Sequence, residues 1–291
     1  MYNSNMLRPF LKWAGNKYRI LDKIIPLLKG KKRLIEPFVG SGAVFLNTDY
    51  ESYILNDKNS DLINLYRILS EKGIEFIEFC ESFFTKENNK AEKYYEFREL
   101  FNSTSDVYLR SALFIYLNRH GYNGLCRYNK KGKFNTPFGR YKKPYFPKKE
   151  MIAFFEKLRS SEIKFFNDDF EPIMKMATKD DAIYCDPPYV PLSGTAYFTD
   201  YSKDGFTIDD QKRLSKAAID IANKGALVVI SNHETTFTIN EYKDASKIIK
   251  FNVRRYISCD GENRNNAPEI LAVFGKCQTG EIYSEMPSLS I

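Results

Sequence analysis

The sequence predicts an α/β fold, with an open and largely parallel sheet interrupted by a mostly helical insertion. Short apolar runs typical of buried strands, such as residues 33–36 and 182–185, alternate with helical spacing near both ends of the chain. Between residues 61 and 149 this alternation stops, and helical spacing leads into a strongly basic stretch. We therefore expect a sheet domain built from residues 1–60 and 150–291, and an inserted domain of residues 61–149.

Composition and cysteine usage narrow the class of protein. The 291 residues are 43% hydrophobic, which is enough for a full core, and the formal net charge of +7 permits a polyanionic partner. The five cysteines are scattered without a C-x-x-C pair, which argues against a zinc site or a disulfide framework and indicates a reducing compartment. Because only two histidines are present, we expect neither a histidine base nor a metal site.

The chain carries no pattern typical of a secreted or membrane protein. Its N-terminus lacks the continuous apolar run of a signal peptide, and no apolar run is long enough to span a bilayer. We expect a soluble protein of the cytoplasm.

The first two motifs predict a ligand site at the ends of strands. Residues 10–17 run from a short apolar piece into a glycine and then into an amphipathic helix over about residues 20–28. Trp13, taken by itself, is typical of a core residue. Residues 33–42 predict a strand and a Gly-x-Gly turn before a helix that begins near Ala43. Such a turn lets the backbone pass close to a ligand and points helix N–H groups at it.

Asp57 ends a second short strand, residues 53–57. An acid at this strand tip is where nucleotide-binding sheets hold ribose hydroxyls. The alternative is that Asp57 caps the following helix, residues 62–69, with Ser60 or Asp61 competing for that role.

The insertion predicts three helices followed by a basic hairpin. Apolar stripes mark helices over residues 62–69, 94–101 and 107–117. Residues 121–149, the basic segment, hold nine Lys and Arg, no Asp or Glu, and seven aromatic residues. Removing those nine from the 44 Lys and Arg leaves 35 against 37 Asp and Glu, so the positive excess is local. A hairpin turning at residues 130–133 suits phosphate contact and stacking, with a solvated charge run as the alternative.

The tetrapeptide Asp186-Pro187-Pro188-Tyr189 follows the strand 182–185, at the end where open α/β sheets bind ligands. Asp186 places an acceptor-only carboxylate there. The prolines stop the strand and remove two N–H donors, which leaves carbonyl acceptors, and Tyr189 adds an aromatic face. These groups suit a planar substrate with an NH2 group, whereas a Pro-Pro turn with a capping Asp is the alternative.

The last third of the chain is expected to complete the sheet with further strands and one capped helix. In chain order, these elements are the strand 163–166, a helix opened by a Thr207–Asp210 capping box and closed by Gly225, the strand 226–230, and a hairpin of residues 251–258 and 269–274 around the polar loop 260–267.

Five ordered motifs carry a resemblance to a known family. The stretches FLKWAGNK (10–17), EPFVGSG (36–42), YILND (53–57) and DPPY (186–189) resemble those of the Dam-type DNA adenine-N6 methyltransferases, the alpha-ordered amino-methyltransferases. Residues 118–146 are similar to the target-recognition hairpin of the members that methylate GATC. The resemblance implies a Rossmann-like, S-adenosylmethionine-dependent sheet that methylates N6 of a flipped-out adenine in double-stranded DNA, within GATC.

The resemblance also assigns residues to roles. The implied cofactor-binding residues are Trp13, Ala14, Gly15, Lys17, Phe38, Gly40, Gly42, Asp57 at the ribose, Asp169 and Phe170 beside the cofactor adenine, and Asp186. The implied catalytic residues are Asp186, Pro187, Pro188 and Tyr189. The implied DNA-binding residues are Lys12, Tyr122, Asn123, Leu125, Arg127, Asn129, Pro137, Arg140 and Tyr141.

The implied chemistry agrees with the residue types. Acceptance of both N6 hydrogens, by Asp186 and the Pro187 carbonyl, favours a pyramidal nitrogen whose lone pair points at the methyl donor, while Tyr189 stacks on the base. Arg127 has bidentate geometry for guanine, and Leu125 with Pro137 could contact a thymine methyl.

Of the remaining implied DNA-binding residues, two contact bases and the others act on the duplex or its backbone. Lys12 and Tyr141 contact other bases of the site, and Tyr122 fills the duplex beside the flipped base. Asn123, Asn129 and Arg140 are expected to orient the hairpin or to hold phosphates.

Two other functions were weighed against methylation of DNA. A regulator that kept the fold but lost catalysis is disfavoured by the intact Asp186, Tyr189 and Gly-x-Gly turn. Methyltransferases of protein glutamine resemble the chain at the tetrapeptide but carry Asn in place of Asp, and the basic segment would have no purpose there. The loop 261–266 holds one basic residue, which argues against a phosphate clamp. A cognate restriction endonuclease would be linked only functionally.

Overall fold

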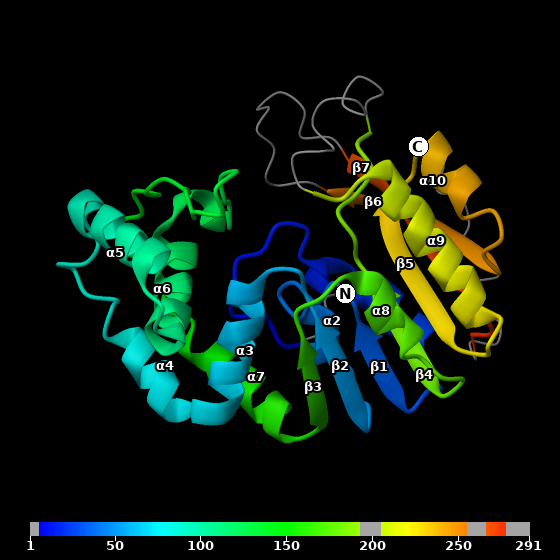
Figure 1. The fold of residues 1–291 in the computed structure, drawn as a ribbon, viewed down its shortest axis with the longest axis horizontal. Helices are drawn as coiled ribbons and strands as arrows, with labels where there is room; N and C mark the ends of the chain where they lie inside the picture. The colour runs from blue at the N-terminus through cyan, green and yellow to red at the C-terminus, as the bar shows by residue number, and fades with distance from the viewer. Residues whose placement is uncertain (1–5, 193–204, 255–265, 278–291) are drawn as a thin grey trace. The chain divides into compact units, whose positions relative to one another are not determined.

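The structure, a computed structural model, describes residues 6–192, 205–254 and 266–277 (Figure 1). By its internal contacts the chain divides into two compact units. The first unit is Met1–Leu21 with Val39–Asp169, and the second is Asp22–Phe38 with Phe170–Ile291. Each unit holds parallel strands alternating with helices, which confirms the predicted α/β class. That residues 61–149 form a domain of their own stays a prediction.

The second unit holds five strands in the order β1-β4-β5-β7-β6. Their bounds are Arg33–Glu36 (β1), Asp181–Cys185 (β4), Leu227–His233 (β5), Lys247–Arg254 (β6) and Asn266–Phe274 (β7). Strands β1, β4 and β5 run parallel, whereas β7 is antiparallel to both β5 and β6. Every residue of β4 and β5 is buried, as expected for parallel strands covered on both faces.

Short helices complete the second unit. They are α1 (Leu21–Ile24, whose first residue belongs to the first unit), η2 (Ile25–Leu28), α8 (Phe170–Lys175), α9 (Ile208–Ala222) and α10 (Thr236–Glu241). Helices α8 and α9 lie side by side, and α9 packs on β5 (Figure 1). The predicted capping box at the start of α9 is confirmed, because Thr207 Oγ1 accepts from Asp210 N and Asp210 accepts from Thr207 N.

The register of β1 on β4 brings a partly buried ion pair together. Arg33 lies opposite Asp181, with Nε 2.8 Å from Oδ1 and Nη2 2.7 Å from Oδ2. Asp181 Oδ2 also accepts a hydrogen bond from Thr178 N. The pair fixes the edge of the sheet opposite to the strand ends that carry the predicted site.

The first unit pairs β2 (Ser52–Asn56) with β3 (Glu162–Phe166) in parallel and surrounds one central helix. Its helices are η1 (Lys17–Ile20), α2 (Ala43–Leu46), α3 (Ser60–Lys72), α4 (Ile74–Glu81), α5 (Ala91–Ser103), α6 (Val107–His120), η3 (Tyr122–Gly124) and α7 (Lys148–Arg159). Helix α6 packs against α3, α4 and α5, and all its residues from Ser111 to His120 are buried. Its three last residues are therefore buried polar groups that need partners.

Several predicted elements differ from the structure. The helix expected over residues 20–28 is three short pieces (η1, α1 and η2), because Pro26 lacks an N–H and begins a tighter turn. The insertion contains α4 as a fourth helix, separated from α3 by Gly73 at φ +53°. Helices α7, α8 and α10 were not predicted. Most of the loop 260–267 lies outside the described residues.

The basic segment makes the predicted turn but not a regular hairpin. Gly132 adopts φ +71° in the turn, and Asn129 O accepts from Gly132 N. Pairing of the two arms is limited to isolated bridges, Gly121 with Phe138 and Tyr128 with Phe134.

We expect His120 to make stability depend on pH. Its ring stacks on Tyr116 at 3.9 Å, and burial lowers its pKa to about 4. In the unfolded chain the pKa is about 6.5, so the unfolded state binds more protons between these values. Stability therefore falls as the pH drops through this window, by up to about 3 kcal/mol, and this contribution does not grow further below pH 4.

The substitution His120→Phe keeps an aromatic ring and removes this titration. Urea unfolding at about pH 7, 5.5 and 4.5 should show a smaller loss of stability in the variant than in the parent protein. Equal pH slopes for both proteins would show that His120 is not held neutral.

Candidate functional site

The glycine turn of the first unit lies against Trp13. Gly40 and Gly42 have φ values of +48° and +69°, in the region that favours glycine. A Cβ on Gly40 would lie 2.9 Å from Trp13 Nε1, so the indole packs directly on the bare backbone. The structure thus brings two of the predicted cofactor motifs together. The expectation that Trp13 is a core residue is wrong, because its side chain is half-buried.

Asp57 holds this turn. Its Oδ2 accepts from Gly40 N at 3.0 Å and its Oδ1 accepts from Asn59 N at 2.9 Å. Burial raises the pKa of Asp57, while these two amides act in the opposite direction. Each carboxylate oxygen can accept a second hydrogen bond, so the group can still receive two hydroxyls. This pair of acceptors fits the two hydroxyls of a ribose.

Asp57 does not cap the helix α3, which was its alternative role. The cap of α3 is Asn59, whose Oδ1 accepts from Leu62 N at 3.2 Å. Ser60 and Asp61, the two competing candidates, lie inside the helix and do not cap it.

A second loop of the first unit lies beside Asp57. Asn167 Nδ2 donates to Asp57 O at 2.8 Å, and the Asn56 amide bonds both Asp168 N and Asp168 O. These bonds bring the predicted cofactor residue Asp169, which follows directly, to the same strand end as Asp57.

The other cofactor candidates of the first unit lie in its first loop. Lys17 is buried, and its Nζ donates to Gly15 O at 2.6 Å. Ala14 and Gly15 are exposed, so their backbone is open to a ligand.

The cofactor candidates of the second unit form an aromatic surface. Phe38 and Phe170 stack at 5.4 Å with an interplanar angle of 28°. Phe206, which sequence reasoning missed, contacts both rings at 5.7 and 5.5 Å. Phe170 and Phe206 are buried, and Phe38 is half-buried, so the Phe38 ring is the one that can offer an apolar face to a planar heterocycle such as the adenine of the cofactor.

The tetrapeptide after β4 is held by polar side chains of β5 and α9. Ser231 Oγ donates to Asp186 Oδ1 at 2.9 Å, and Val190 N donates to Asn232 Oδ1 at 3.0 Å. Gln211 Nε2 donates to Pro188 O at 2.8 Å. These three contacts fix the turn without using the Pro187 carbonyl, which accepts no hydrogen bond from any described residue.

Tyr189 is fixed at both ends of its ring. The ring meets His233 edge-on at 4.8 Å, and its hydroxyl donates to Glu269 Oε2 at 3.4 Å. Burial raises the pKa of Tyr189, so the hydroxyl stays protonated. His233 itself lies 2.6 Å from Val190 O through Nδ1, which makes it part of the support of the loop. The site thus presents a carboxylate and a carbonyl beside a positioned ring.

In the first unit, Lys12 lies against the basic segment. Lys12 Nζ is 4.3 Å from the centre of the Tyr141 ring, and Tyr141 Oη accepts from Asn123 N at 2.9 Å. Burial, with a smaller contribution from the nearby Arg119, lowers the pKa of Lys12. Asn118 bonds both backbone groups of Lys12 and donates to Gly124 O, which joins the two segments. Three predicted DNA-binding residues therefore lie together.

Most other predicted DNA-binding residues are exposed on the basic segment. The exposed ones are Tyr122, Asn123, Arg127, Asn129, Pro137 and Arg140, and Leu125 is half-buried. Arg127 Nε donates to Asn135 Oδ1 at 2.8 Å, and its Nη2 donates to Asn135 O at 3.3 Å. The side edge of the guanidinium, Nε with one Nη2 hydrogen, is therefore occupied, whereas Nη1 and the second Nη2 hydrogen, which form the end edge, make no hydrogen bond to Asn135. Asn129 Oδ1 accepts from Lys131 N and Lys133 N and so shapes the turn.

Sequence reasoning missed the polar residues that support the site. Asn118, Gln211, Ser231 and Asn232 are all buried. Two kinds of signal could have found them. Asn118 follows the apolar helical run 112–117, and Ser231 with Asn232 follow the apolar run 226–230. A buried polar residue at such a position needs a hydrogen-bond partner.

In the described ranges, no group of three or more His, Cys, Asp or Glu side chains is arranged to hold a metal ion. No helix in the same ranges is long and apolar enough to cross a membrane.

Comparison with known proteins decides the family. The model of the D12 class of N6 adenine-specific DNA methyltransferases matches residues 13–257. The chain belongs to this family. It is 48% identical over 267 residues to the DNA adenine methylase of Escherichia coli (strain K12), covering 92% of this chain and 95% of the relative.

Two further DNA adenine methylases are similar to the chain over most of its length. The DNA adenine methylase of Vibrio cholerae (El Tor Inaba N16961) is 48% identical over 269 residues, covering 92% of this chain and 96% of its own. The DNA adenine methylase of Serratia marcescens is 47% identical over 268 residues, covering 92% and 98%.

Membership of the D12 class gives the chain its reaction. It is a site-specific DNA methyltransferase that uses S-adenosylmethionine to methylate N6 of adenine. The residues fit this cofactor on structural grounds: Asp57 offers two acceptors beside a glycine turn that Trp13 covers, and Phe38, stacked on Phe170, offers a flat apolar face.

We expect Gly40→Ala to weaken cofactor binding about tenfold or more, because a Cβ there meets Trp13 and must also adopt a left-handed φ. Trp13 is the single tryptophan, so the quench of intrinsic fluorescence on addition of S-adenosylmethionine measures the affinity. Gly132→Ala is the matched control, since it has a φ of +71° and nothing within 4 Å. If both variants bind the cofactor alike, Trp13 and Gly40 do not form the cofactor site.

Proposed function

We propose that the chain methylates the adenine of GATC sites in double-stranded DNA after that adenine has flipped out of the duplex. The observation that carries the proposal is the turn after β4. Asp186 and the Pro187 carbonyl are two acceptors beside the ring of Tyr189, and side chains of β5 and α9 hold them in place. A stacked adenine cannot reach such a turn, so base flipping is part of the proposal.

S-adenosylmethionine supplies the methyl group. The N6 amine is a poor nucleophile, because its lone pair is delocalised into the ring. Asp186 accepts one N6 hydrogen and the Pro187 carbonyl accepts the other, which favours a nitrogen whose lone pair is localised. The bond from Ser231 Oγ fixes the rotation of the Asp186 carboxylate. Rate acceleration then comes from position and electrostatics.

For the cofactor, we infer that Asp57 accepts the two ribose hydroxyls while Phe38, stacked on Phe170, packs on the adenine. Trp13, Ala14, Gly15, Lys17, Gly40, Gly42, Asp169 and Asp186 would supply the remaining contacts.

For GATC, we infer that the exposed residues of the basic segment contact DNA. Arg127 pairs with guanine O6 and N7 through its end edge, since Asn135 occupies its side edge. Leu125 and Pro137 contact the thymine methyl, and Lys12 with Tyr141 contacts another base.

The other members of this surface act mainly on the DNA backbone. Tyr122, whose side chain is exposed by 52%, fills the duplex beside the flipped base. Asn123, Asn129 and Arg140 order the segment or hold phosphates. The relatives' printed name, DNA adenine methylase, supports the choice of adenine. We place the reaction in the cytoplasm, in line with described cysteines that are all free thiols.

We expect Asp186→Ala to reduce turnover about 10²- to 10³-fold, because it removes an acceptor that acts on the reacting amine. The measurement is transfer of labelled methyl groups to a GATC duplex at saturating cofactor. Asp209→Ala is the control, because Asp209 is exposed on α9 and pairs only with Lys212. Retention of more than a few per cent of turnover by Asp186→Ala would contradict the assignment.

We expect Arg127→Ala to relax recognition of one base pair. Loss of a bidentate guanine contact costs about 1–3 kcal/mol of discrimination, on the order of ten- to a hundredfold, at that position alone. The test is turnover on GATC and on duplexes that carry each single-base change. Arg127→Lys should recover only part of the discrimination, because the planar fork is lost.

The same duplexes test the proposed function as a whole. The parent protein should methylate GATC far faster than any altered duplex. If Arg127→Ala lowers turnover on all duplexes by one common factor, Arg127 is a phosphate anchor and does not read a base.

A further inference from the structure

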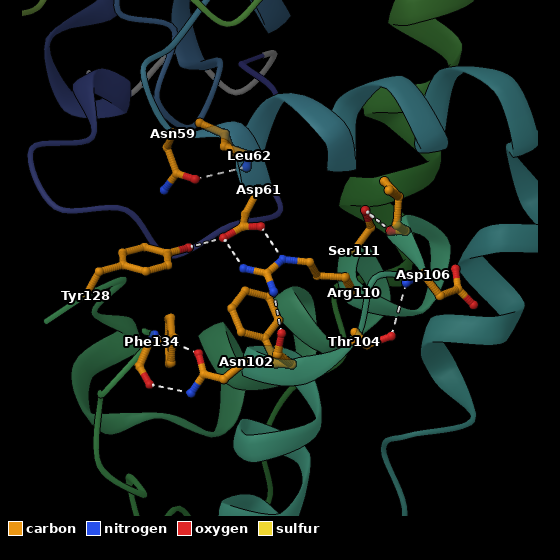
Figure 2. A network of polar contacts seen from close by, with 12 residues as sticks. Asn59, Asp61, Leu62, Asn102, Thr104, Asp106, Arg110, Ser111, Tyr128 and Phe134 are labelled. Atoms are coloured by element: carbon orange, nitrogen blue, oxygen red, sulfur yellow. Dashed lines mark hydrogen bonds and ion pairs between the residues drawn. The ribbon is translucent and has the colours of Figure 1, made fainter. Parts of the chain in front are cut away.

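The two arms of the basic segment are each fixed to helices of the first unit. On the second arm, Asn102 of α5 bonds both backbone groups of Phe134: its Oδ1 accepts from Phe134 N at 2.8 Å, and its Nδ2 donates to Phe134 O at 3.0 Å (Figure 2). A side-chain amide thus takes the place of a neighbouring strand. The Phe134 ring is buried and meets the Phe101 ring edge-on at 5.6 Å.

On the first arm, Tyr128 reaches the start of α3. Its hydroxyl donates to Asp61 Oδ2 at 2.7 Å (Figure 2). Burial and the Asp61 carboxylate both raise the pKa of Tyr128, so the hydroxyl is protonated and serves as a donor. Its ring meets Phe134 edge-on at 5.6 Å, which links the two arms.

Asp61 is itself held by Arg110 of α6. Arg110 Nε lies 2.5 Å from Asp61 Oδ1, and its Nη2 lies 3.1 Å from Asp61 Oδ2 (Figure 2). The guanidinium also donates to Phe101 O and lies over the Phe101 ring at 4.1 Å. The acceptor of the Tyr128 hydroxyl therefore cannot turn away without breaking a largely buried ion pair.

The inward position of the Tyr128 side chain sets the direction in which the neighbouring Arg127 side chain points. In extended backbone, successive side chains point to opposite faces. Tyr128 points inward, and Arg127 and Asn129 on either side are exposed. The backbone is extended and paired here, since Asn135 N donates to Arg127 O and Tyr128 bridges to Phe134. Fixing the tip of Tyr128 thus restricts rotation of the arm and the direction in which Arg127 leaves it.

We propose that the Tyr128 hydroxyl, held by the Asp61–Arg110 ion pair, is a positioning group for base recognition that aims Arg127 at its base. This rests on the proposed role of Arg127. Tyr128 contacts neither base nor cofactor, and it acts through the angle of the arm. Asn135 then sets which edge of the Arg127 guanidinium is presented, so two contacts together define one geometry.

The test is Tyr128→Phe, which keeps the ring contacts with Phe134 and leaves the Asp61–Arg110 pair intact. The ratio of kcat/KM on GATC to kcat/KM on the duplex altered at the Arg127 guanine should fall about three- to tenfold, the usual size of coupling between neighbouring residues. Discrimination at the other positions should not change, and neither should cofactor affinity measured by Trp13 fluorescence.

Two controls separate positioning from a general structural role. Tyr108→Phe makes the same change on α6, where the Tyr108 ring packs on Phe76 and Phe79 outside this network, and it should leave the ratio unchanged. In an Arg127→Ala background, Tyr128→Phe should cause no further loss of discrimination at that position, because the group through which it acts is absent.

The outcomes distinguish this inference from the proposed function. If Arg127→Ala relaxes discrimination and Tyr128→Phe does not, only the inference is overturned. A lower melting temperature with turnover reduced equally on all duplexes would also overturn it. An additive effect in the Arg127→Ala background would show that Tyr128 does not act through Arg127. If Arg127→Ala leaves discrimination unchanged, the base-reading part of the proposed function fails, and the inference fails with it.

Discussion

The first unit depends on one carboxylate that accepts hydrogen bonds from two backbone amides. Asp57 holds the N–H of Gly40, in a left-handed turn that few residues adopt, and the N–H of Asn59, which caps α3. Without such an acceptor, the amide of the glycine turn would need another partner, at a cost of about 1–3 kcal/mol if it were buried. Two residues after Asn59, Asp61 reaches the basic segment through Tyr128. Residues 57–61 therefore hold both the glycine turn, through Asp57, and the first arm of the basic segment, through Asp61.

The second unit uses the same physical device with neutral groups. Ser231 and Asn232 lie near the end of β5, and their side chains hold the turn after β4, while Gln211 reaches it from α9. Asn232 Nδ2 in turn donates to Gln211 Oε1 and Tyr242 Oη, so the supporting groups support each other. Buried polar networks that are satisfied in only one arrangement make a turn rigid. Rigidity is what a site that works by position requires.

The sheet could be predicted from the sequence because burial on both faces forces short apolar runs, as in β4 and β5. The break of the first helix at Pro26 and the cap at Asn59 follow from local rules and could have been predicted more sharply. The basic segment is different. Its arms pair only at isolated bridges, and on the outer edge of the second arm the Asn102 side chain, from a helix, binds both backbone groups of Phe134. No local sequence pattern predicts that a side chain of a distant helix binds this backbone.

The candidate site shows the same division. The motifs alone predicted which segments would meet a ligand, and the structure brings the glycine turn together with Trp13 and Asp57. The partners that hold those segments, such as Asn118 for Lys12 and Ser231 for Asp186, lie far away in the sequence. Pairings over that distance depend on the finished fold, and a single sequence does not contain them as a pattern.

The charge of the basic segment explains the chemistry of its supports. Residues 121–143 hold seven Lys and Arg, and in the described ranges no carboxylate pairs with any of them. Their order comes from amides: Asn135 holds Arg127, Asn129 holds the turn, and Asn118 and Asn102 hold the backbone. At Asn135 and Asn129, whose Oδ1 atoms accept, a carboxylate could take the place of the amide, but it would cancel positive charge that attracts phosphates. At Asn118 and Asn102 the amide also donates to carbonyl oxygens, which a carboxylate cannot do. Asp61 is compatible with this arrangement because Arg110, outside the segment, neutralises it. Tyr128 therefore gains a strong acceptor without lowering the positive charge of the surface that we propose for DNA binding.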